Sequence, residues 1–266
     1  MGAMFPGREL WYHDYADAWL AGPLGRFLDY GCGGGAMLQR VHRRCAECWG
    51  VDADEAVLPR DLAGVNVRPI RAGERIPFED GAFDTIAILD VIEHVADERA
   101  VLGELARVLA PGGRLLLTTP HKGLLTWLDP GNLKFLFPQL HRFTHRTVLR
   151  RADHYEDHFG QARREARGMI ADFTIDQNPW HRHYRYDEVR ALAPHSLETV
   201  SWAVYNPGLR LCCCARIACR VLTRGRYAKD PWPFNVWNHW ASRRETVLGD
   251  QLVVLFRRTS LEDGRD

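Results

Sequence analysis

The chain has 266 residues, of which 46% are hydrophobic and 26% charged, as in an ordinary globular protein. This length suits one α/β domain with insertions, and the net charge of +1 argues against a nucleic-acid partner, which usually requires a strong basic excess. No apolar run of about 18 residues and no apolar segment near the start is present, so neither a transmembrane helix nor a signal peptide is expected. The scattered cysteines favour free thiols in a reducing cytoplasm over disulfides or a zinc site.

Residues 9–20 (ELWYHDYADAWL) predict an aromatic-rich helix ahead of the first strand. Two interpretations are open for this helix. It packs on the protein, or it carries Tyr12, His13 or Tyr15 over a ligand as a lid.

The stretch from Arg26 to Gly35 (RFLDYGCGGG) predicts a buried strand that ends at Tyr30 and runs into a glycine turn, with a helix opening at about Ala36. Glycines allow positive φ and close approach of a ligand to the backbone, and the helix offers free N–H groups. The spacing fits both the dinucleotide pattern G-x-G-x-x-G/A and the pattern G-x-G-x-G. Asp29, two residues before the first glycine, suits an ammonium group better than a pyrophosphate and so favours a ligand shaped like S-adenosylmethionine.

The second predicted strand, residues 48–52, ends in a carboxylate. Asp52 follows Asp29 at about the spacing at which a second-strand acid takes up a ribose diol. The alternative is a helix N-cap for residues 55–62, and the two roles are compatible.

The next segments continue an alternation of strands and helices. Residues 65–70 predict the third strand, residues 74–84 a loop with turn residues, and residues 85–89 a strand in the centre of a parallel sheet. An amphipathic helix follows, expected to stop at Pro111-Gly112-Gly113, with its apolar positions at Val101, Leu102, Leu105, Val108 and Leu109. Residues 114–119 predict the fifth strand.

The segments LDYGCGGG, GVD, IPFEDGAFD, DVIEHV and ELARVLAPGGRLLLTTP together cover about residues 25–121. In this combination the chain resembles the class I S-adenosylmethionine-dependent methyltransferases that act on small molecules. The resemblance implies a Rossmann-like α/β fold with helices on both faces of a seven-stranded sheet, mostly parallel with the last strand antiparallel. The dinucleotide interpretation has no comparable further motifs.

The resemblance also implies which residues bind S-adenosylmethionine. The glycine turn and Asp29 are expected at the methionine end, Asp52 at the ribose, and Ile76 with Leu89 beside the adenine and thioether. The family often has an acid near the adenine where this chain has Ala72, so Glu74 or backbone N–H groups near Gly73 would have to serve. The full set of expected cofactor-binding residues is Asp29, Tyr30, Gly31, Cys32, Gly33, Gly35, Asp52, Ala53, Glu74, Ile76 and Leu89.

Two mechanisms for activating the acceptor are open. Asp90, Glu93 and His94 would share one face if a helix began there, which resembles the magnesium site of ubiquinone-pathway O-methyltransferases and small-RNA 2′-O-methyltransferases, and a bound Mg²⁺ would lower the pKa of a hydroxyl group. Imidazole is, however, an unusual magnesium ligand. The metal-free alternative is a general base, either His94 or His121. We favour His121 because it stands where the fifth strand ends, at the edge where open α/β sheets bind ligands.

Residues 122–183 form a predicted insertion, which we interpret as a substrate lid. Part of it, residues 132–145, is expected to be helical, and residues 146–169 form a charged helical stretch. The pairs His141/His145 and His154/His158 have i,i+4 spacing, which is compatible with metal binding but is more simply explained by surface or packing histidines.

The C-terminal part predicts a helix over residues 186–192, a sixth strand over 197–203 and a seventh over 249–257. The core would then comprise residues 22–121 and 184–257. A second insertion, residues 206–248, separates the last two strands. Its segment 209–222 is apolar with a narrow arginine stripe and predicts a helix that lies at a membrane interface or packs on the protein.

The sequence therefore predicts methyl transfer, at an oxygen of a small-molecule, sugar or lipid-linked acceptor. Metal-assisted methylation of a quinone precursor or an RNA 2′-hydroxyl, and a non-catalytic cofactor-binding scaffold, are the alternatives. A cytoplasmic location is expected, with peripheral contact to the inner face of the membrane through residues 209–240 as a further hypothesis.

Overall fold

The computed structural model describes residues 18–123, 126, 129, 137–148, 182–207, 214–215, 218–219, 222, 245–246 and 249–259. Several predicted features lie outside these residues. They are the candidate lid side chains near the N-terminus, the His154/His158 pair and most of the two insertions, including the greater part of segments 146–169 and 209–240.

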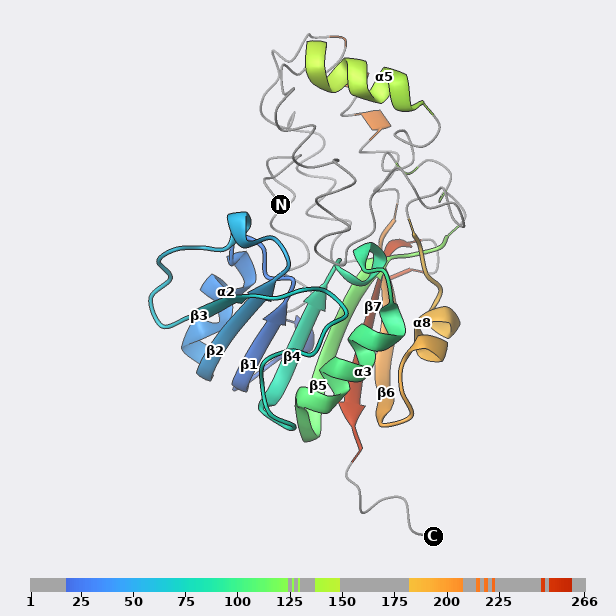
Figure 1. Ribbon diagram of the computed structural model, residues 1–266. Coiled ribbons are helices and arrows are strands. Elements are labelled where there is room, and N and C mark those ends of the chain that lie inside the picture. The colour runs from blue at the N-terminus through green and yellow to red at the C-terminus, as the bar shows by residue number, and fades with distance from the viewer. Residues whose placement is uncertain are drawn as a thin grey trace.

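A single seven-stranded sheet organises the described residues, with the strand order β3-β2-β1-β4-β5-β7-β6 (Figure 1). The strands are β1 Gly25–Tyr30, β2 Cys45–Asp52, β3 Asn66–Pro69, β4 Phe83–Leu89, β5 Leu109–Pro120, β6 Leu197–Pro207 and β7 Gly249–Arg258. Strands β1 to β5 are parallel, and β7 runs antiparallel between β5 and β6. The predicted Rossmann-like fold is therefore confirmed.

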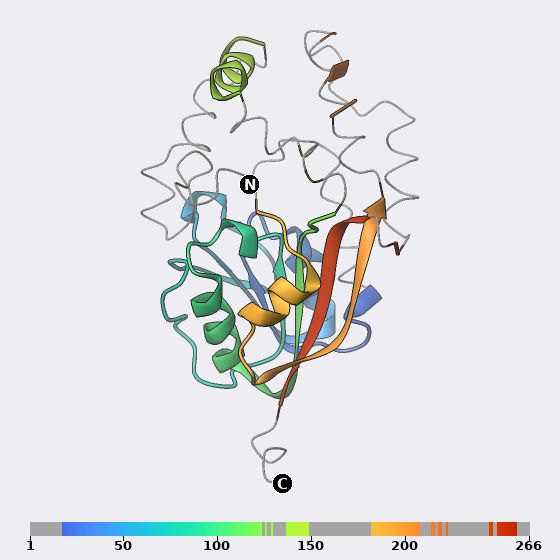
Figure 2. The same cartoon turned by 90° about the vertical axis from the view of Figure 1, so that its right-hand side faces the viewer.

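Helices cover both faces of the sheet, as the two views together show (Figure 2). The helices and helical turns are α2 Ala36–Val41, η2 His42–Arg44, η3 Glu55–Val57, η4 Ile92–His94, α3 Glu98–Val108, α5 Pro138–Phe143, the π-helical turn η7 Thr144–Val148 and α8 Tyr186–Leu192. Within the described ranges, no helix combines the length and the hydropathy that crossing a bilayer requires.

Two apolar clusters fix these helices to the sheet. One cluster joins α3 and α8 to one face through residues such as Leu105, Val189 and Leu117, and the other joins α2 to the opposite face through Leu38 and Leu116. Alternate residues of β5 enter opposite clusters, as the two-residue repeat of a strand requires. The continuous apolar run of β5 is thus explained by burial on both sides.

Two predicted helices end earlier than expected. The helix expected over residues 55–62 is only the short turn η3, because Leu58 precedes Pro59 and adopts an extended conformation. Helix α3 ends at Val108, ahead of the expected stop at Pro111, since Leu109 is already extended and pairs with Phe83 of β4. Pro111 also disfavours a helical conformation at Ala110, the residue before it.

The strand order creates a topological switch point between β1 and β4. The chain leaves β1 for β2 on one side and later returns to β4 on the other, so the loops after these two strands diverge at the carboxyl edge of the sheet. Ligands bind at such a point in open α/β sheets. The predicted cofactor residues lie near the ends of β1, β2 and β4 and in the loops after β1, β2 and β3.

Candidate active site

The glycine turn after β1 is held tightly to β2 and to the loop after β4. Gly31, Gly33 and Gly35 all have positive φ, and the N–H groups of Gly31 and Cys32 donate to the Val51 carbonyl at 2.7 and 3.0 Å. A Cβ atom added at Gly33 or Gly34 would meet nothing within 4 Å. The turn is therefore constrained at its ends and open in its middle, where a ligand could approach the backbone.

Asp52 joins the end of β2 to this turn. Its Oδ2 accepts from the Gly33 N–H and its Oδ1 from the Asp54 N–H, both at 2.8 Å. Asp54, not Asp52, caps the short turn η3 by accepting from the Ala56 N–H. A carboxylate has about four lone-pair sites, so two hydrogen bonds leave Asp52 able to accept from the hydroxyl groups of a ribose.

Asp29 is a buried carboxylate, only 3% exposed, near the end of β1. Burial, together with the negative charge of Asp52, raises the pKa of Asp29 to about 7. A cation bound beside the two carboxylates would favour their ionised forms and relieve the repulsion between them. These residues therefore fit a ligand that carries an ammonium or sulfonium group.

The residues expected at the adenine end are arranged less uniformly. Burial raises the pKa of Tyr30 to about 12, against a backbone hydrogen bond from Gly73, so the Tyr30 hydroxyl lies against that backbone. Glu74 is exposed and pairs with Arg71 at 2.8 Å. Ile76, also expected beside the adenine, has a side chain that is 1% exposed and packs in the cluster that joins α3 to the sheet. The remaining two expected residues, Ala53 and Leu89, are half-buried.

The three candidate magnesium ligands do not share one helix face. Asp90 has φ 53 and turns toward β5 and β7, where its Oδ1 accepts from Thr118 Oγ1 at 2.9 Å and from the Gln251 amide. Glu93, on the short turn η4, accepts from Thr119 Oγ1 at 3.1 Å. Among the residues that the structure describes, no group of three His, Cys, Asp or Glu side chains could hold a metal ion. The magnesium hypothesis therefore gains no support.

His121 stands at the end of β5 with its ring anchored. Its backbone N–H donates to the Asp250 carbonyl, and its Nδ1 lies 2.9 Å from the Gly249 carbonyl oxygen. A carbonyl oxygen only accepts, so Nδ1 carries the proton in this contact and Nε2 is the basic nitrogen of the neutral ring. His94, the other candidate base, is buried with its Nε2 3.9 Å from Glu93.

A histidine–carboxylate pair beside His121 was not anticipated from the sequence. His183 Nε2 lies 2.6 Å from Asp129 Oδ2, and the two side chains are 3% and 15% exposed. The pair joins both ends of the predicted lid, since Tyr184 also pairs with His121 and donates to the Pro120 carbonyl. The only signal in the sequence was the high number of histidines in this region, which cannot identify a partner 54 residues away.

The chain has a Rossmann-like α/β fold, with an open glycine turn and the carboxylates of Asp29 and Asp52 near its switch point. A protein-family profile described as a methyltransferase domain matches residues 28–117. A ubiquinone biosynthesis O-methyltransferase of Pseudomonas aeruginosa strain UCBPP-PA14 is 29% identical over 191 residues, which are 68% of this chain and 78% of that protein. Its counterpart in Alkalilimnicola ehrlichii is 32% identical over 123 residues, 43% of this chain and 50% of that protein.

Solved structures show the same fold. A sarcosine dimethylglycine methyltransferase, described as putative, from Galdieria sulphuraria matches with a TM-score of 0.53 at 18% identity, over 93% of this chain and 85% of that one. An S-adenosylmethionine-dependent methyltransferase from Mesorhizobium loti matches with a TM-score of 0.53 at 16% identity, over 92% and 96%. The chain is a class I S-adenosylmethionine-dependent methyltransferase, and its methyl donor is S-adenosylmethionine.

Proposed function

We propose that this methyltransferase methylates an oxygen atom of a small-molecule acceptor and that His121 is the general base. The observation that carries the proposal is the contact between His121 Nδ1 and the Gly249 carbonyl, which makes Nε2 the basic nitrogen of a ring at the carboxyl end of β5. The name of the relatives, ubiquinone biosynthesis O-methyltransferase, supports oxygen as the methylated atom.

The donor would be held by the residues around the switch point. Asp29 would pair with the ammonium group, Asp52 would accept from the ribose hydroxyl groups, and the open backbone at Gly33 and Gly34 would line the methionine moiety. S-adenosylmethionine supplies a methyl group on an electrophilic sulfonium. The protein then has to align the acceptor oxygen and remove its proton, and alignment alone can contribute several kcal/mol, about 7–11 in the best cases.

His121 suits the proton transfer. Because the Gly249 carbonyl fixes its tautomer, Nε2 can accept the hydroxyl proton as the oxygen attacks, and the imidazolium that forms keeps its Nδ1–H donor. The dipole of that carbonyl would stabilise the positive charge on the ring. Proton transfer of this kind contributes about 10²- to 10⁴-fold in rate.

A surface within the predicted lid supports a lipid-linked acceptor. Phe137, Leu140 and Phe143 are 55%, 60% and 58% exposed and recur every third residue along α5 and its N-cap, Phe137. Arg142 and Arg146 are exposed beside them, and residues 137–148 contain no acidic side chain. Helix α5 lies beyond the carboxyl edge of the sheet (Figure 1), the edge at which we place the acceptor. A basic, aromatic face of this kind fits an anionic membrane surface.

One experiment tests the proposed reaction. The protein is incubated with methyl-labelled S-adenosylmethionine and matched phenolic acceptors, each as a free hydroxyl, as its methyl ether and with a long apolar chain. Label in the free hydroxyl compounds alone would support methylation at oxygen, and faster transfer to the long-chain compound would support a lipid-linked acceptor. Label transferred equally to the ether would contradict the proposal, because the ether has no hydroxyl proton to remove.

A further inference from the structure

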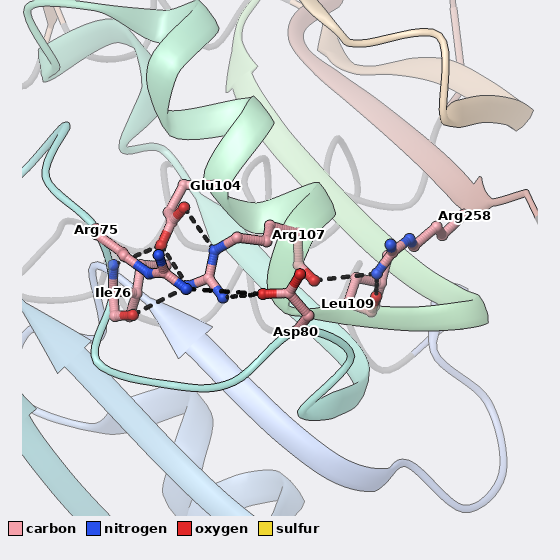
Figure 3. A network of polar contacts seen from close by, with 7 residues as sticks. All are labelled: Arg75, Ile76, Asp80, Glu104, Arg107, Leu109 and Arg258. Carbon is pink, nitrogen blue, oxygen red and sulfur yellow. Dashed lines mark hydrogen bonds and ion pairs between the residues drawn. The ribbon is translucent and has the colours of Figure 1, made fainter.

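Side chains of helix α3 form hydrogen bonds with the backbone of the loop that connects β3 to β4, here called the 70–82 loop. The Ile76 N–H donates to Glu104 Oε1 at 2.6 Å, and the Ile76 carbonyl accepts from an Arg107 terminal nitrogen at 3.1 Å (Figure 3). Both polar groups of one loop residue are thus bound by side chains one turn apart on α3. The Ile76 side chain fills the core beneath, so this residue fixes the loop by three means.

Arg107 is fully engaged in this arrangement. Its Nε and one terminal nitrogen donate to the two oxygens of Glu104 at 2.9 and 2.6 Å, and the other terminal nitrogen donates to Asp80 at 2.6 Å. Arginine is suited to this geometry because its planar fork matches a carboxylate. Burial favours the neutral form of Glu104, but the hydrogen bonds from Arg107 and from the Ile76 backbone outweigh it and lower the pKa of Glu104. The pair therefore stays ionised.

The part of the loop ahead of Ile76 lies beside the proposed cofactor site. The Ile70 N–H donates to the Asp52 carbonyl at 2.9 Å, so the first residue of the loop is hydrogen-bonded to the residue that we assign to the ribose. A tight turn then follows, in which the Glu74 N–H donates to the Arg71 carbonyl at 3.2 Å. A Cβ atom added at Gly73 would meet nothing within 4 Å, which leaves open space next to this turn.

The 71–74 turn has mostly backbone N–H and C=O groups with which an adenine ring could form hydrogen bonds. Arg71 and Glu74 pair with each other at 2.8 Å, and Ala72 has no polar side-chain atom. A base attached to a ribose held by Asp52 has to lie beside the segments that flank Asp52, and residues 70–74 are one of them. Recognition by backbone N–H and C=O groups depends on where the backbone is held, because these groups cannot rotate to meet the ligand as a side chain can.

We propose that Glu104 and Arg107 are positioning residues for the adenine end of S-adenosylmethionine. By fixing Ile76 they set the place of the 71–74 turn relative to Asp52, and the turn then contacts the base. This inference rests on the cofactor site of the proposed function. In this proposal neither the Glu104 nor the Arg107 side chain touches the cofactor, and neither takes part in methyl transfer.

The test compares binding of S-adenosylhomocysteine with binding of its hypoxanthine analogue, S-inosylhomocysteine, by calorimetry. For Arg107→Ala we expect about tenfold weaker binding of the adenine compound and a smaller preference over the analogue, with kcat at saturating donor within twofold of the wild type. Arg107→Lys should lie in between, since a lysine cannot form the bidentate pair. Arg75→Ala is the matched control, because Arg75 belongs to the same loop, is 76% exposed and only approaches Asp80 at 3.9 Å.

Should Arg107→Ala fail to fold, Glu104→Gln takes its place, since a glutamine oxygen can still accept from Ile76 while the ionic pair is lost. Unchanged affinity and unchanged preference in these variants would overturn the inference. An equal loss for both compounds, accompanied by a lower melting temperature, would assign the pair a purely structural role and would also overturn it. A wild-type chain that binds neither compound would instead contradict the cofactor site itself.

Discussion

Gly31 faces Val91 across the switch point, so closely that a Cβ atom added at Gly31 would lie 2.3 Å from Val91 Cγ2. Gly31 also has φ 80, a backbone angle that residues other than glycine rarely adopt. The turn after β1 and the loop after β4 are therefore locked together by the absence of a side chain. Their contact fixes the separation of these two loops at the switch point.

We expect Gly31→Ala to destabilise the protein by about 3 kcal/mol, because overpacking and the strained φ act together. Denaturant unfolding would measure the change. Gly34→Ala is the matched control in the same turn, since its Cβ would meet nothing within 4 Å and its backbone lies outside the positive-φ region. Equal midpoints for the two variants would show that the contact with Val91 is not as tight as described.

Asp29 should make the affinity for the donor depend on pH. In the absence of a ligand, burial and the charge of Asp52 raise the pKa of Asp29 to about 7, whereas an ammonium partner favours its ionised form. Affinity for S-adenosylmethionine should therefore rise with pH up to about 7 and level off just above it. Below 7 the loss should approach tenfold for each pH unit. Titrations between pH 5.5 and 7.5 would measure it.

Asp29→Asn is expected to bind the donor about 10- to 100-fold more weakly at pH 7.5, as the loss of a charged hydrogen-bond acceptor implies. Its affinity should be nearly independent of pH over the same interval. A variant that retained the slope of the wild type would show that another group titrates in the site.

The same carboxylate should reduce the stability of the ligand-free protein. Because the folded-state pKa of Asp29 lies above its ordinary value of 3.8, folding becomes less favourable as pH rises from about 4 to about 7, and the penalty is then constant. Asp29→Asn should therefore be more stable than the wild type at pH 8, by at most about 4 kcal/mol in the free energy of unfolding measured with denaturant. The two proteins should converge at acidic pH. A less stable variant at pH 8 would contradict the sign of this effect.

Much of the site could be predicted from the sequence because its signals are local. The glycines, Asp29 and Asp52 stand at fixed offsets from strands whose apolar runs are unambiguous, and the sheet then brings them together. The burial of Ile76 could not be predicted, because an isolated apolar residue in a loop looks the same whether it faces a ligand or the core. Only the partners on α3, nearly 30 residues away, decide between these positions.

Longer-range pairings at the acceptor side could not be predicted. The φ of 53 at Asp90 follows from its hydrogen bonds to Thr118 and Gln251, and the latter lies 161 residues further along the chain. No periodic pattern encodes such a contact. The spacing of Asp90, Glu93 and His94 predicts one shared helix face, but the hydrogen bonds of Asp90 turn its side chain toward β5 and β7.

The assignment of the base rests on comparing two histidines. His121→Ala should retain the donor affinity of the wild type and lose about 10²- to 10⁴-fold in turnover, because a general base acts in the transition state and not in donor binding. His94→Ala should lose much less turnover, since His94 is buried beside Glu93. Calorimetry with S-adenosylhomocysteine and single-turnover methyl transfer would separate the two quantities. A full loss in the His94 variant with turnover preserved in the His121 variant would move the role to His94.

The exposed row on α5 should determine binding to lipid surfaces. Replacing Phe137, Leu140 and Phe143 by serine removes the apolar face while leaving the neighbouring arginines in place. We expect the wild type to float with vesicles that contain anionic phosphatidylserine, and the triple variant to remain with the unbound protein.

Trp202→Ser is the matched control, because Trp202 is also an exposed apolar residue, 48% exposed, but lies on the edge strand β6. High salt should weaken flotation of the wild type if Arg142 and Arg146 contribute, since screening reduces attraction between exposed charges. Equal flotation of wild type and triple variant would show that α5 is not the contact, and flotation of neither would remove the proposed membrane surface.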